Sequence, residues 1–193
     1  MSLRWTDWNE SGFQMVYILL APGFEEAEAL VPADLLRRAG IETALVSLEG
    51  DSVTGSHQIT VKADLELSQA DLDRAEMVVL PGGGRGVENL GKSPAVADLV
   101  RNAAERSIPL AAICAAPTLL ARWGQLEGKQ AVCFPGMEDQ MKGTLLRPEA
   151  KVVEDGDRIT GRAAGSAFDF GLALVRYLAG EDKADEVRRA VHY

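Results

Sequence analysis

The chain has 193 residues and a net charge of -9 at pH 7, with 47% apolar and 25% charged residues. This is the composition of a soluble globular protein, and the length is sufficient for one complete hydrophobic core. The acidic balance disfavours nucleic acid and anionic membrane surfaces as partners, and no apolar run in the sequence reaches the roughly 18 residues of a membrane-spanning helix.

Cysteine and histidine are scarce, with two of each in the chain. Two cysteines do not make a disulfide framework at this length, which indicates a reducing compartment, and we expect a cytoplasmic protein without a signal peptide. The four side chains form no close Cys/His cluster in the sequence, so we expect no metal. We also expect no cofactor.

Residues 1–14 precede the first regular pattern and have no clear period. The first three residues resemble an expression scar, so we predict a tag or N-terminal extension over 1–14 and one domain over 15–193. Trp5, Trp8 and Phe13 are large apolar residues for a free tail, and packing on a surface would accommodate them.

From residue 16 onward, short apolar runs alternate with helical patterns. We predict strands at 16–20, 43–48, 77–80, 108–113, 130–133, 151–154 and 158–161, with one or two more within 56–67. Helices are predicted at 25–39, from 86, and at 95–107, 117–123, 166–178 and 182–190, with a helical turn at 71–75 and a cap by Ser166 on the helix that follows it. Alternation of this kind predicts an α/β fold with a parallel sheet covered on both faces.

The stretch 108–120 combines a buried-strand pattern with a helix start. An apolar run ends at Cys114, two alanines follow, and Pro117 suits the first turn of a helix because its missing N–H needs no partner there. Helix N–H groups would then face the thiol and favour thiolate, which predicts a pKa well below that of free cysteine and a reactive Cys114. The alternative is a small buried hydrophobe, which most cysteines are.

A glycine-rich loop follows the strand at 77–80. Gly82, Gly83 and Gly84 would let backbone N–H groups face a concavity, as in an anion nest or oxyanion hole, although glycines also serve turns alone. The loop lacks the Lys-Ser/Thr pair of a P-loop. Because ligands bind outside the carboxyl ends of parallel strands, we expect this loop to meet Cys114 there.

Three acidic residues open the first helix. Glu25, Glu26 and Glu28 suit the positive end of the helix dipole, and this role is sufficient for two of them. Pro32 lies four residues after Glu28 and predicts a kink that leaves the Glu28 carbonyl free. If the Glu28 side chain faces the sulfur of Cys114, its pKa rises, and the neutral acid can donate to a thiolate and move protons on a substrate.

Four segments together resemble the ThiJ/PfpI superfamily: residues 21–28, 80–83, 112–118 and 166–171. The resemblance runs from 16 to about 191 and is strongest with the branch that contains the parkinsonism-associated protein deglycase and the bacterial YajL-like proteins. It implies a flavodoxin-like three-layer α/β sandwich with a mostly parallel central sheet, usually as a homodimer.

The same resemblance assigns roles to site residues. It implies Cys114 as nucleophile and redox centre, Glu28 as its protonated partner, and the backbone N–H groups of Gly83 and Ala115 as oxyanion donors. Gly82, His57 and Phe134 are placed at the rim of the site. For His57 two readings stay open: a solvated loop histidine, or a substitute base or anion-binding group where relatives carry an arginine.

Departures from the family pattern narrow the chemistry. Ala115 stands where the protease-like members have histidine after the cysteine, which argues against a Cys-His peptidase. Phe134 stands where members with strong glyoxalase activity have a histidine, so the usual second base is missing. Glutamine amidotransferases need a downstream His-x-Glu, and His192 is followed only by Tyr193, which excludes that class.

Two functions are therefore expected from the sequence. One is a cysteine-dependent stress-protection enzyme, a deglycase or a glyoxalase-like protein, acting on small α-oxoaldehydes such as methylglyoxal and glyoxal or on their early glycated adducts. The other is a non-catalytic redox sensor or chaperone in which Cys114 oxidises to a sulfinate. Both need the same thiolate, and the sequence does not rank them.

Overall fold

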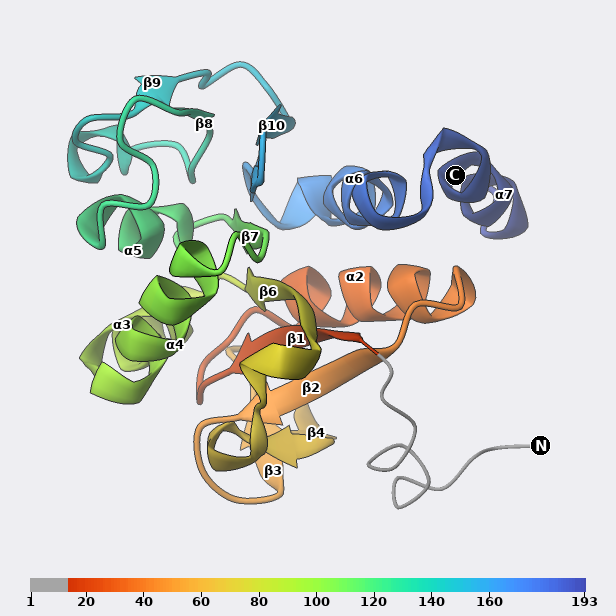
Figure 1. The fold of residues 1–193 in the computed structure, drawn as a ribbon, viewed down its shortest axis with the longest axis horizontal. Helices are drawn as coiled ribbons and strands as arrows, with labels where there is room; N and C mark the ends of the chain where they lie inside the picture. The colour runs from red at the N-terminus through yellow and green to blue at the C-terminus, as the bar shows by residue number, and fades with distance from the viewer. Residues whose placement is uncertain (1–13) are drawn as a thin grey trace.

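A seven-stranded sheet runs through the centre of the computed structural model, which describes residues 14–193 (Figure 1). Its strands, in spatial order, are β10 (Val152–Asp155), β11 (Arg158–Gly161), β7 (Leu110–Ile113), β6 (Ala75–Leu80), β1 (Met15–Leu20), β2 (Thr43–Ser47) and β5 (Leu65–Glu66). Every neighbouring pair is parallel except β10 and β11, which form an antiparallel hairpin. The predicted α/β class with a mostly parallel sheet is confirmed.

Helices cover both faces of this sheet and make the three layers seen in Figure 1. One face carries α2 (Glu26–Arg38), α6 (Ala167–Ala179) and α7 (Glu181–Ala190), and the other carries α3 (Gly84–Lys92), α4 (Pro94–Glu105) and α5 (Pro117–Arg122). Among the residues that the structure describes, no helix has the length and apolar character needed to cross a membrane.

The central strands are apolar throughout because each of their faces packs on a helix layer. Along β1, Tyr17 and Leu19 belong to the cluster beneath α3, α4 and α5, whereas Ile18 and Leu20 belong to the cluster beneath α2 and α6. All six residues of β1 are buried. The two-residue alternation along each strand thus builds two separate cores.

The register of the sheet brings three loops to one edge. Ile18 of β1 pairs with Val79 of β6, and Leu80 of β6 pairs with Ala112 of β7. These strands end within a few residues of one another at their carboxyl ends. The loops that begin at Ala21 and Pro81, and the turn at Cys114, therefore meet at a single place, as the sequence predicted.

Three local predictions differ from the structure. Ser52–Thr54 forms a strand, β3, that was not predicted, and it pairs with β4 (Thr60–Lys62). The strand predicted at 130–133 is only Gln130–Ala131 (β8), because the Val132 N–H donates to the hydroxyl of Thr160 instead of extending a ladder with β9 (Leu145–Leu146).

The predicted Ser166 cap is also wrong. Ser166 precedes α6, but its side chain makes no capping hydrogen bond, because the residue ends a short 3₁₀ turn over Ala164–Ser166 and its own N–H bonds to the Ala163 carbonyl. Further 3₁₀ turns lie at Leu67–Gln69, Leu72–Arg74 and Glu138–Gln140. The predicted N-terminal extension lies almost wholly outside the described residues.

Candidate active site

Cys114 occupies the sharp turn between β7 and α5 that the sequence predicted. Its backbone has a φ of +67°, in the left-handed region that residues with a side chain rarely adopt. Hydrogen bonds hold the turn on both sides: the Cys114 N–H donates to the Gly161 carbonyl at 2.9 Å, and the Phe134 N–H donates to the Cys114 carbonyl at 2.7 Å. The surrounding strands therefore fix a strained conformation that presents a half-buried thiol.

Two backbone N–H groups lie against the Cys114 sulfur. They belong to Gly83 and Ala115, and both act to lower the pKa of the thiol. Gly83 has a φ of +91°, and a β-carbon there would lie 2.5 Å from the Gly23 carbonyl oxygen, so only glycine fits this loop. The structure thus brings together the two donors that were assigned to an oxyanion hole, although their catalytic role stays a prediction.

Glu28 is completely buried in the first turn of α2, behind Cys114. Burial raises the pKa of its carboxyl group to about 7, and the nearby Cys114 thiol and Gly82 backbone only partly oppose this rise. Within the described residues, neither carboxyl oxygen has a hydrogen-bond partner in regular geometry. The carboxyl group is consequently protonated for part of the time near neutral pH.

Gly82 is the reason that the thiol and the carboxyl group can approach each other. A β-carbon at this position would lie 2.2 Å from Glu28 Oε2 and 2.6 Å from the Cys114 β-carbon. Any side chain here would push the two groups apart. Gly82 thus lies where the thiol and the carboxyl group approach each other.

The pKa predicted for Cys114 is wrong. Burial, together with the charge of Glu28 and the close approach of its carboxyl group, raises the pKa of the thiol to about 12, and the two N–H groups do not outweigh these effects. The helix that follows has only six residues, so its dipole is small. At neutral pH Cys114 is therefore a thiol, and the Glu28 carboxyl group lies beside it.

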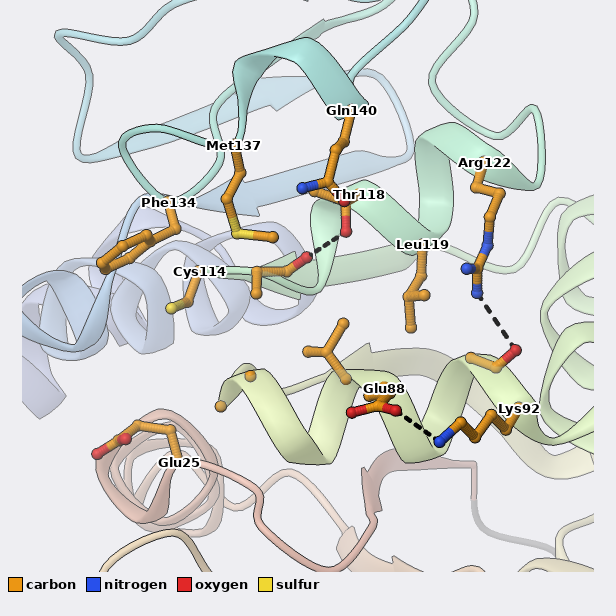
Figure 2. Close-up of a pocket in the computed structure, with 15 residues that line it drawn as sticks. Glu25, Glu88, Lys92, Cys114, Thr118, Leu119, Arg122, Phe134, Met137 and Gln140 are labelled. Carbon is orange, nitrogen blue, oxygen red and sulfur yellow. Dashed lines mark hydrogen bonds and ion pairs between the residues drawn. The ribbon is translucent and has the colours of Figure 1, made fainter.

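A cavity of about 620 Å³ opens beside Cys114 (Figure 2). Its lining residues come from the start of α2, the glycine loop, α3, the turn at Cys114, α5 and the segment after β8: Glu25, Gly83, Gly84, Val87, Glu88, Gly91, Lys92, Cys114, Ala115, Thr118, Leu119, Arg122, Phe134, Met137 and Gln140. Phe134 forms a wall next to Cys114 and is 44% exposed. Glu28, Gly82 and His57 do not line this cavity.

The far wall of the cavity contains residues that were not predicted from the sequence. Thr118 and Arg122 are four residues apart on α5 and so share one face of that helix. This spacing could have predicted that both side chains line the same surface. Met137 precedes a single 3₁₀ turn and Gln140 ends it, and this turn is too short for a periodic pattern that would have placed them here.

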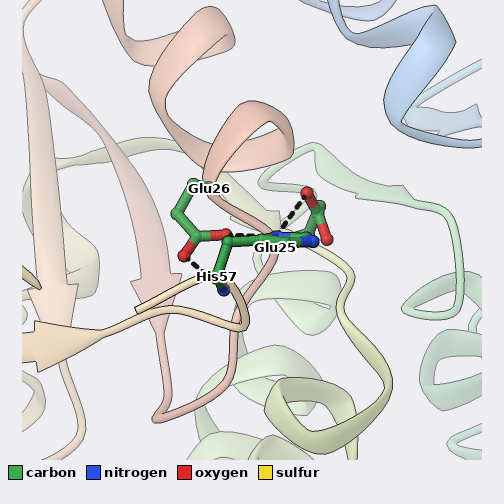
Figure 3. Close-up of side chains that lie close together, drawn as sticks. All are labelled: Glu25, Glu26 and His57. Atoms are coloured by element: carbon green, nitrogen blue, oxygen red, sulfur yellow. Dashed lines mark hydrogen bonds and ion pairs between the residues drawn. The ribbon is translucent and has the colours of Figure 1, made fainter. Parts of the chain in front are cut away.

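His57 lies in the turn between β3 and β4, next to the start of α2 (Figure 3). Its Nδ1 is 3.0 Å from Glu26 Oε2 and 3.4 Å from Glu25 Oε1, and its backbone N–H donates to Glu26 Oε1 at 2.7 Å. The hydrogen bond to Glu26 raises the pKa of the imidazole. His57 is thus exposed and lies beside two carboxylates, and its own side chain does not line the cavity.

Within residues 14–193, Glu25, Glu26 and His57 also place three potential metal-ligating atoms within 4.8 Å of one another. The oxygens of Glu26 already accept hydrogen bonds from His57 and from the hydroxyl of Ser56. These internal bonds account for the arrangement of the group without an ion.

The fold and site define a class: a flavodoxin-like α/β protein with a cysteine at a strand-to-helix turn and a buried glutamate beside it. The sequence profile of the DJ-1/PfpI family matches residues 14–177. Protein dj-1beta of Drosophila melanogaster is 40% identical over 176 residues, which cover 90% of this chain and 94% of that protein. The chain therefore belongs to the DJ-1/PfpI family.

Further comparisons agree with this assignment. A protein of Pyrococcus abyssi named a deglycase is 30% identical and aligns over 84% of this chain and 98% of its own. The crystal structure of Drosophila DJ-1beta superimposes with a TM-score of 0.89 at 38% identity, covering 93% of this chain and 97% of that one. Toxoplasma gondii DJ-1, solved in a form described as oxidized, gives a TM-score of 0.88 at 31% identity over 93% and 98% of the two chains.

Proposed function

We propose that this protein is a cysteine-dependent enzyme of aldehyde stress that acts on methylglyoxal, glyoxal or their early adducts, with Cys114 as nucleophile and Glu28 as proton carrier. The observation that carries the proposal is the buried pairing of Cys114 with Glu28, whose pKa of about 7 matches a group that both accepts and donates protons near neutral pH. The deglycase name of the Pyrococcus abyssi relative supports the substrate class.

The first step forms a carbon–sulfur bond. The Cys114 sulfur attacks the aldehyde carbon of methylglyoxal while the thiol proton passes to the Glu28 carboxylate. The carbonyl oxygen becomes an anion, which the N–H groups of Gly83 and Ala115 stabilise until Glu28 returns the proton. In an early adduct, the sulfur instead bonds to the hydroxyl-bearing carbon as the bond from that carbon to the carrier amine or thiol breaks, and Glu28 passes the thiol proton to the leaving group. Either route gives the same thiohemiacetal.

The second step is a proton shift between neighbouring carbons. Glu28 removes the proton from the carbon bound to sulfur and delivers it to the adjacent carbon. The proton of the hydroxyl next to sulfur passes to the ketone oxygen, so that hydroxyl becomes a carbonyl and the ketone becomes a hydroxyl. The product is a lactoyl thioester of Cys114, and water hydrolyses it to lactate and the free thiol. Phe134 supplies no base for this step, so we expect adduct formation to be quicker than the rearrangement.

Turnover of methylglyoxal to lactate by wild type and Cys114→Ser tests this proposal. Loss of turnover in Cys114→Ser, with Cys133→Ser unaffected, is the expected result. Cys133 is a matched control because it is also a free cysteine, is buried and has a raised pKa, yet does not line the cavity. Equal turnover in wild type and Cys114→Ser would refute the assignment of Cys114 as the nucleophile.

We also propose a redox role as the second candidate. Two equivalents of peroxide would convert the Cys114 thiolate to a sulfinate and two waters, and the N–H groups of Gly83 and Ala115 would stabilise the charged product. The oxidized form recorded for Toxoplasma gondii DJ-1 favours this candidate. After limited peroxide, mass spectrometry should find sulfinic acid at Cys114 before any modification of Cys133; preference for Cys133 would exclude the role.

We further propose that the protein works in the cytoplasm as a homodimer. The family resemblance and the scarcity of cysteine support these two assignments. Sedimentation at micromolar concentration tests the dimer, and a monomer there would contradict it.

A further inference from the structure

The cavity beside Cys114 is much larger than the aldehydes proposed above. Its volume of about 620 Å³ is within the roughly 300–1,000 Å³ typical of sites for ligands of drug size. Methylglyoxal has five non-hydrogen atoms and would fill only the end next to the thiol. A ligand that fills the cavity must therefore carry a second part beyond the reacting carbon.

The character of the lining changes along the cavity (Figure 2). Cys114 and Phe134 lie at one end, Leu119 lies in the middle, and Arg122 and Lys92 lie at the other end. Over α5, the rise from Pro117 to Arg122 is about 7.5 Å, at roughly 1.5 Å per residue. A carrier of about two amino-acid residues spans such a length, since an extended residue covers roughly 3.3–3.6 Å.

Two contacts orient the exposed side chain of Arg122 at the far end of the cavity. Its Nη2 donates to the Gly91 carbonyl of α3 at 3.2 Å, and its guanidinium carbon lies 5.8 Å from the centre of the Trp123 ring. A β-carbon at Gly91 would lie 2.3 Å from Nη2 and 2.9 Å from Leu119. Glycine within a helix costs about 1 kcal/mol relative to alanine, and here it makes room for the guanidinium.

Arg122 also keeps donors available for a ligand. The other charged residues of the cavity have partners of their own. Lys92 forms an ion pair with Glu88 at 2.5 Å, and Glu25, at the opposite end of the cavity from Arg122, lies beside His57. In the part of the chain that the structure describes, no carboxylate lies within ion-pair distance of Arg122. A guanidinium has five N–H donors, and only one is used on Gly91, so a pair of donors is left for an oxyanion.

We propose that Arg122 determines specificity by binding a carboxylate or phosphate on the carrier of the aldehyde adduct, while the reacting carbon lies at Cys114. This inference rests on the proposed function and narrows its substrate class to adducts on small anionic carriers. Arg122 would act on binding only, because it lies at the opposite end of the cavity from the thiol. An uncharged adduct of the same size would leave the guanidinium without its partner.

Calorimetric titration with three stable ligands tests the inference. Each is an S-acetonyl dipeptide, in which a thioether replaces the reactive hemithioacetal: N-acetylcysteinylserine with a free carboxylate, N-acetylcysteinylphosphoserine amide, and N-acetylcysteinylserine amide. We expect wild type to bind at least one anionic ligand about tenfold more tightly than the neutral amide, the scale of a charge-assisted hydrogen bond. A preference for one anion alone supports the inference and identifies carboxylate or phosphate as the natural group.

Two arginine variants separate a binding role from a structural one. Arg122→Gln should lose the preference and bind the neutral amide as wild type does, while Arg101→Gln, which removes the same charge from the exposed face of α4, should keep the preference. Equal affinity of wild type for all three ligands, or equal weakening of all three by Arg122→Gln, would overturn the inference.

Failure of the proposed function gives a different result. Cys114→Ser should retain the preference for anionic ligands, because the serine lies at the far end from Arg122. If Cys114→Ser also retains full turnover of methylglyoxal, the nucleophile assignment fails while the anion site stands.

Discussion

Glu26 and Glu28 lie two residues apart in the first turn of α2, and both are buried. Their pKa values nevertheless move in opposite directions, to about 2 for Glu26 and about 7 for Glu28. Burial acts to raise the pKa of both groups, and both are close to the same helix N-terminus. Glu28 is the more deeply buried of the two, so burial contributes to the difference, but neither burial nor the helix dipole they share explains why the pKa of Glu26 falls while that of Glu28 rises.

Hydrogen-bond donors explain it. The Glu26 carboxylate accepts from its own backbone N–H, from the imidazole and backbone N–H of His57, and from the Ile59 N–H. Together these donors stabilise the carboxylate strongly enough to outweigh its burial. Glu28 has only the Cys114 thiol and the Gly82 backbone nearby. The donors of the His57 loop thus keep Glu26 ionised. The glycine loop at Gly82 gives Glu28 fewer donors, so Glu28 can exchange protons near neutral pH.

The largest expected effect comes from Glu28→Gln. It should lower methylglyoxal turnover by about 10²–10⁴-fold, the usual contribution of a general acid or base. Because removing the negative charge lowers the pKa of Cys114, iodoacetamide should label that thiol faster at pH 8 in the variant than in wild type. Glu26→Gln is the matched control and should change neither rate by much. Slow turnover together with slow labelling would indicate a misfolded site instead of a missing proton carrier.

The pH dependence of stability should also separate the two glutamates. Glu28 has a folded pKa of about 7 against an ordinary 4.5, so its stabilising contribution is complete below pH 4.5 and is lost as the pH rises through 7. Glu28→Gln should remove this decline. The free energy of unfolding of the variant, relative to that of wild type, should therefore be about 3 kcal/mol higher at pH 8 than at pH 4.5.

Glu26 should show the opposite sign, with a contribution that is present above pH 4.5 and lost as the pH falls through about 2. Urea titrations at a series of pH values measure both slopes. Parallel curves for wild type and Glu28→Gln between pH 4.5 and 8 would mean that Glu28 is not perturbed as described.

Phe134→His should sharpen the comparison by giving the site a second base. The ring of Phe134 already lines the cavity beside Cys114, so an imidazole there is placed to assist the proton shift between carbons. We expect turnover to lactate to rise by up to about 10²-fold, at the lower end of a general-base contribution, while the rate of thiohemiacetal formation stays the same. Stopped-flow measurement of adduct formation beside steady-state lactate production checks both parts.

His57→Ala should have the smallest effect. His57 is exposed and already bound to Glu26, so methylglyoxal turnover should stay within about twofold of wild type, as exposed ion pairs contribute little. A variant that loses all activity while Phe134→His gains none would place the second base in the His57 turn and contradict our account.

Much of this site could be predicted because short patterns determine it. An apolar run ending at Cys114, followed by Pro117, specifies a strand-to-helix turn, and parallel strands bring the Gly83 loop and Glu28 to the same edge. The pKa of Cys114 could not be predicted, because it depends on how deeply packing buries the sulfur and how close Gly82 allows Glu28 to come. The wall near Met137 was missed because irregular segments carry no periodic signal.

The left-handed backbone of Cys114 has a consequence for the evolution of stability. A residue with a side chain loses roughly 1–2 kcal/mol in this conformation, which glycine adopts freely. Selection for thermal stability alone would therefore favour glycine at position 114, whereas selection for thiol chemistry would retain cysteine there. A screen of variants at this position would show a trade-off, in which the proteins most resistant to unfolding include ones that have lost their nucleophile.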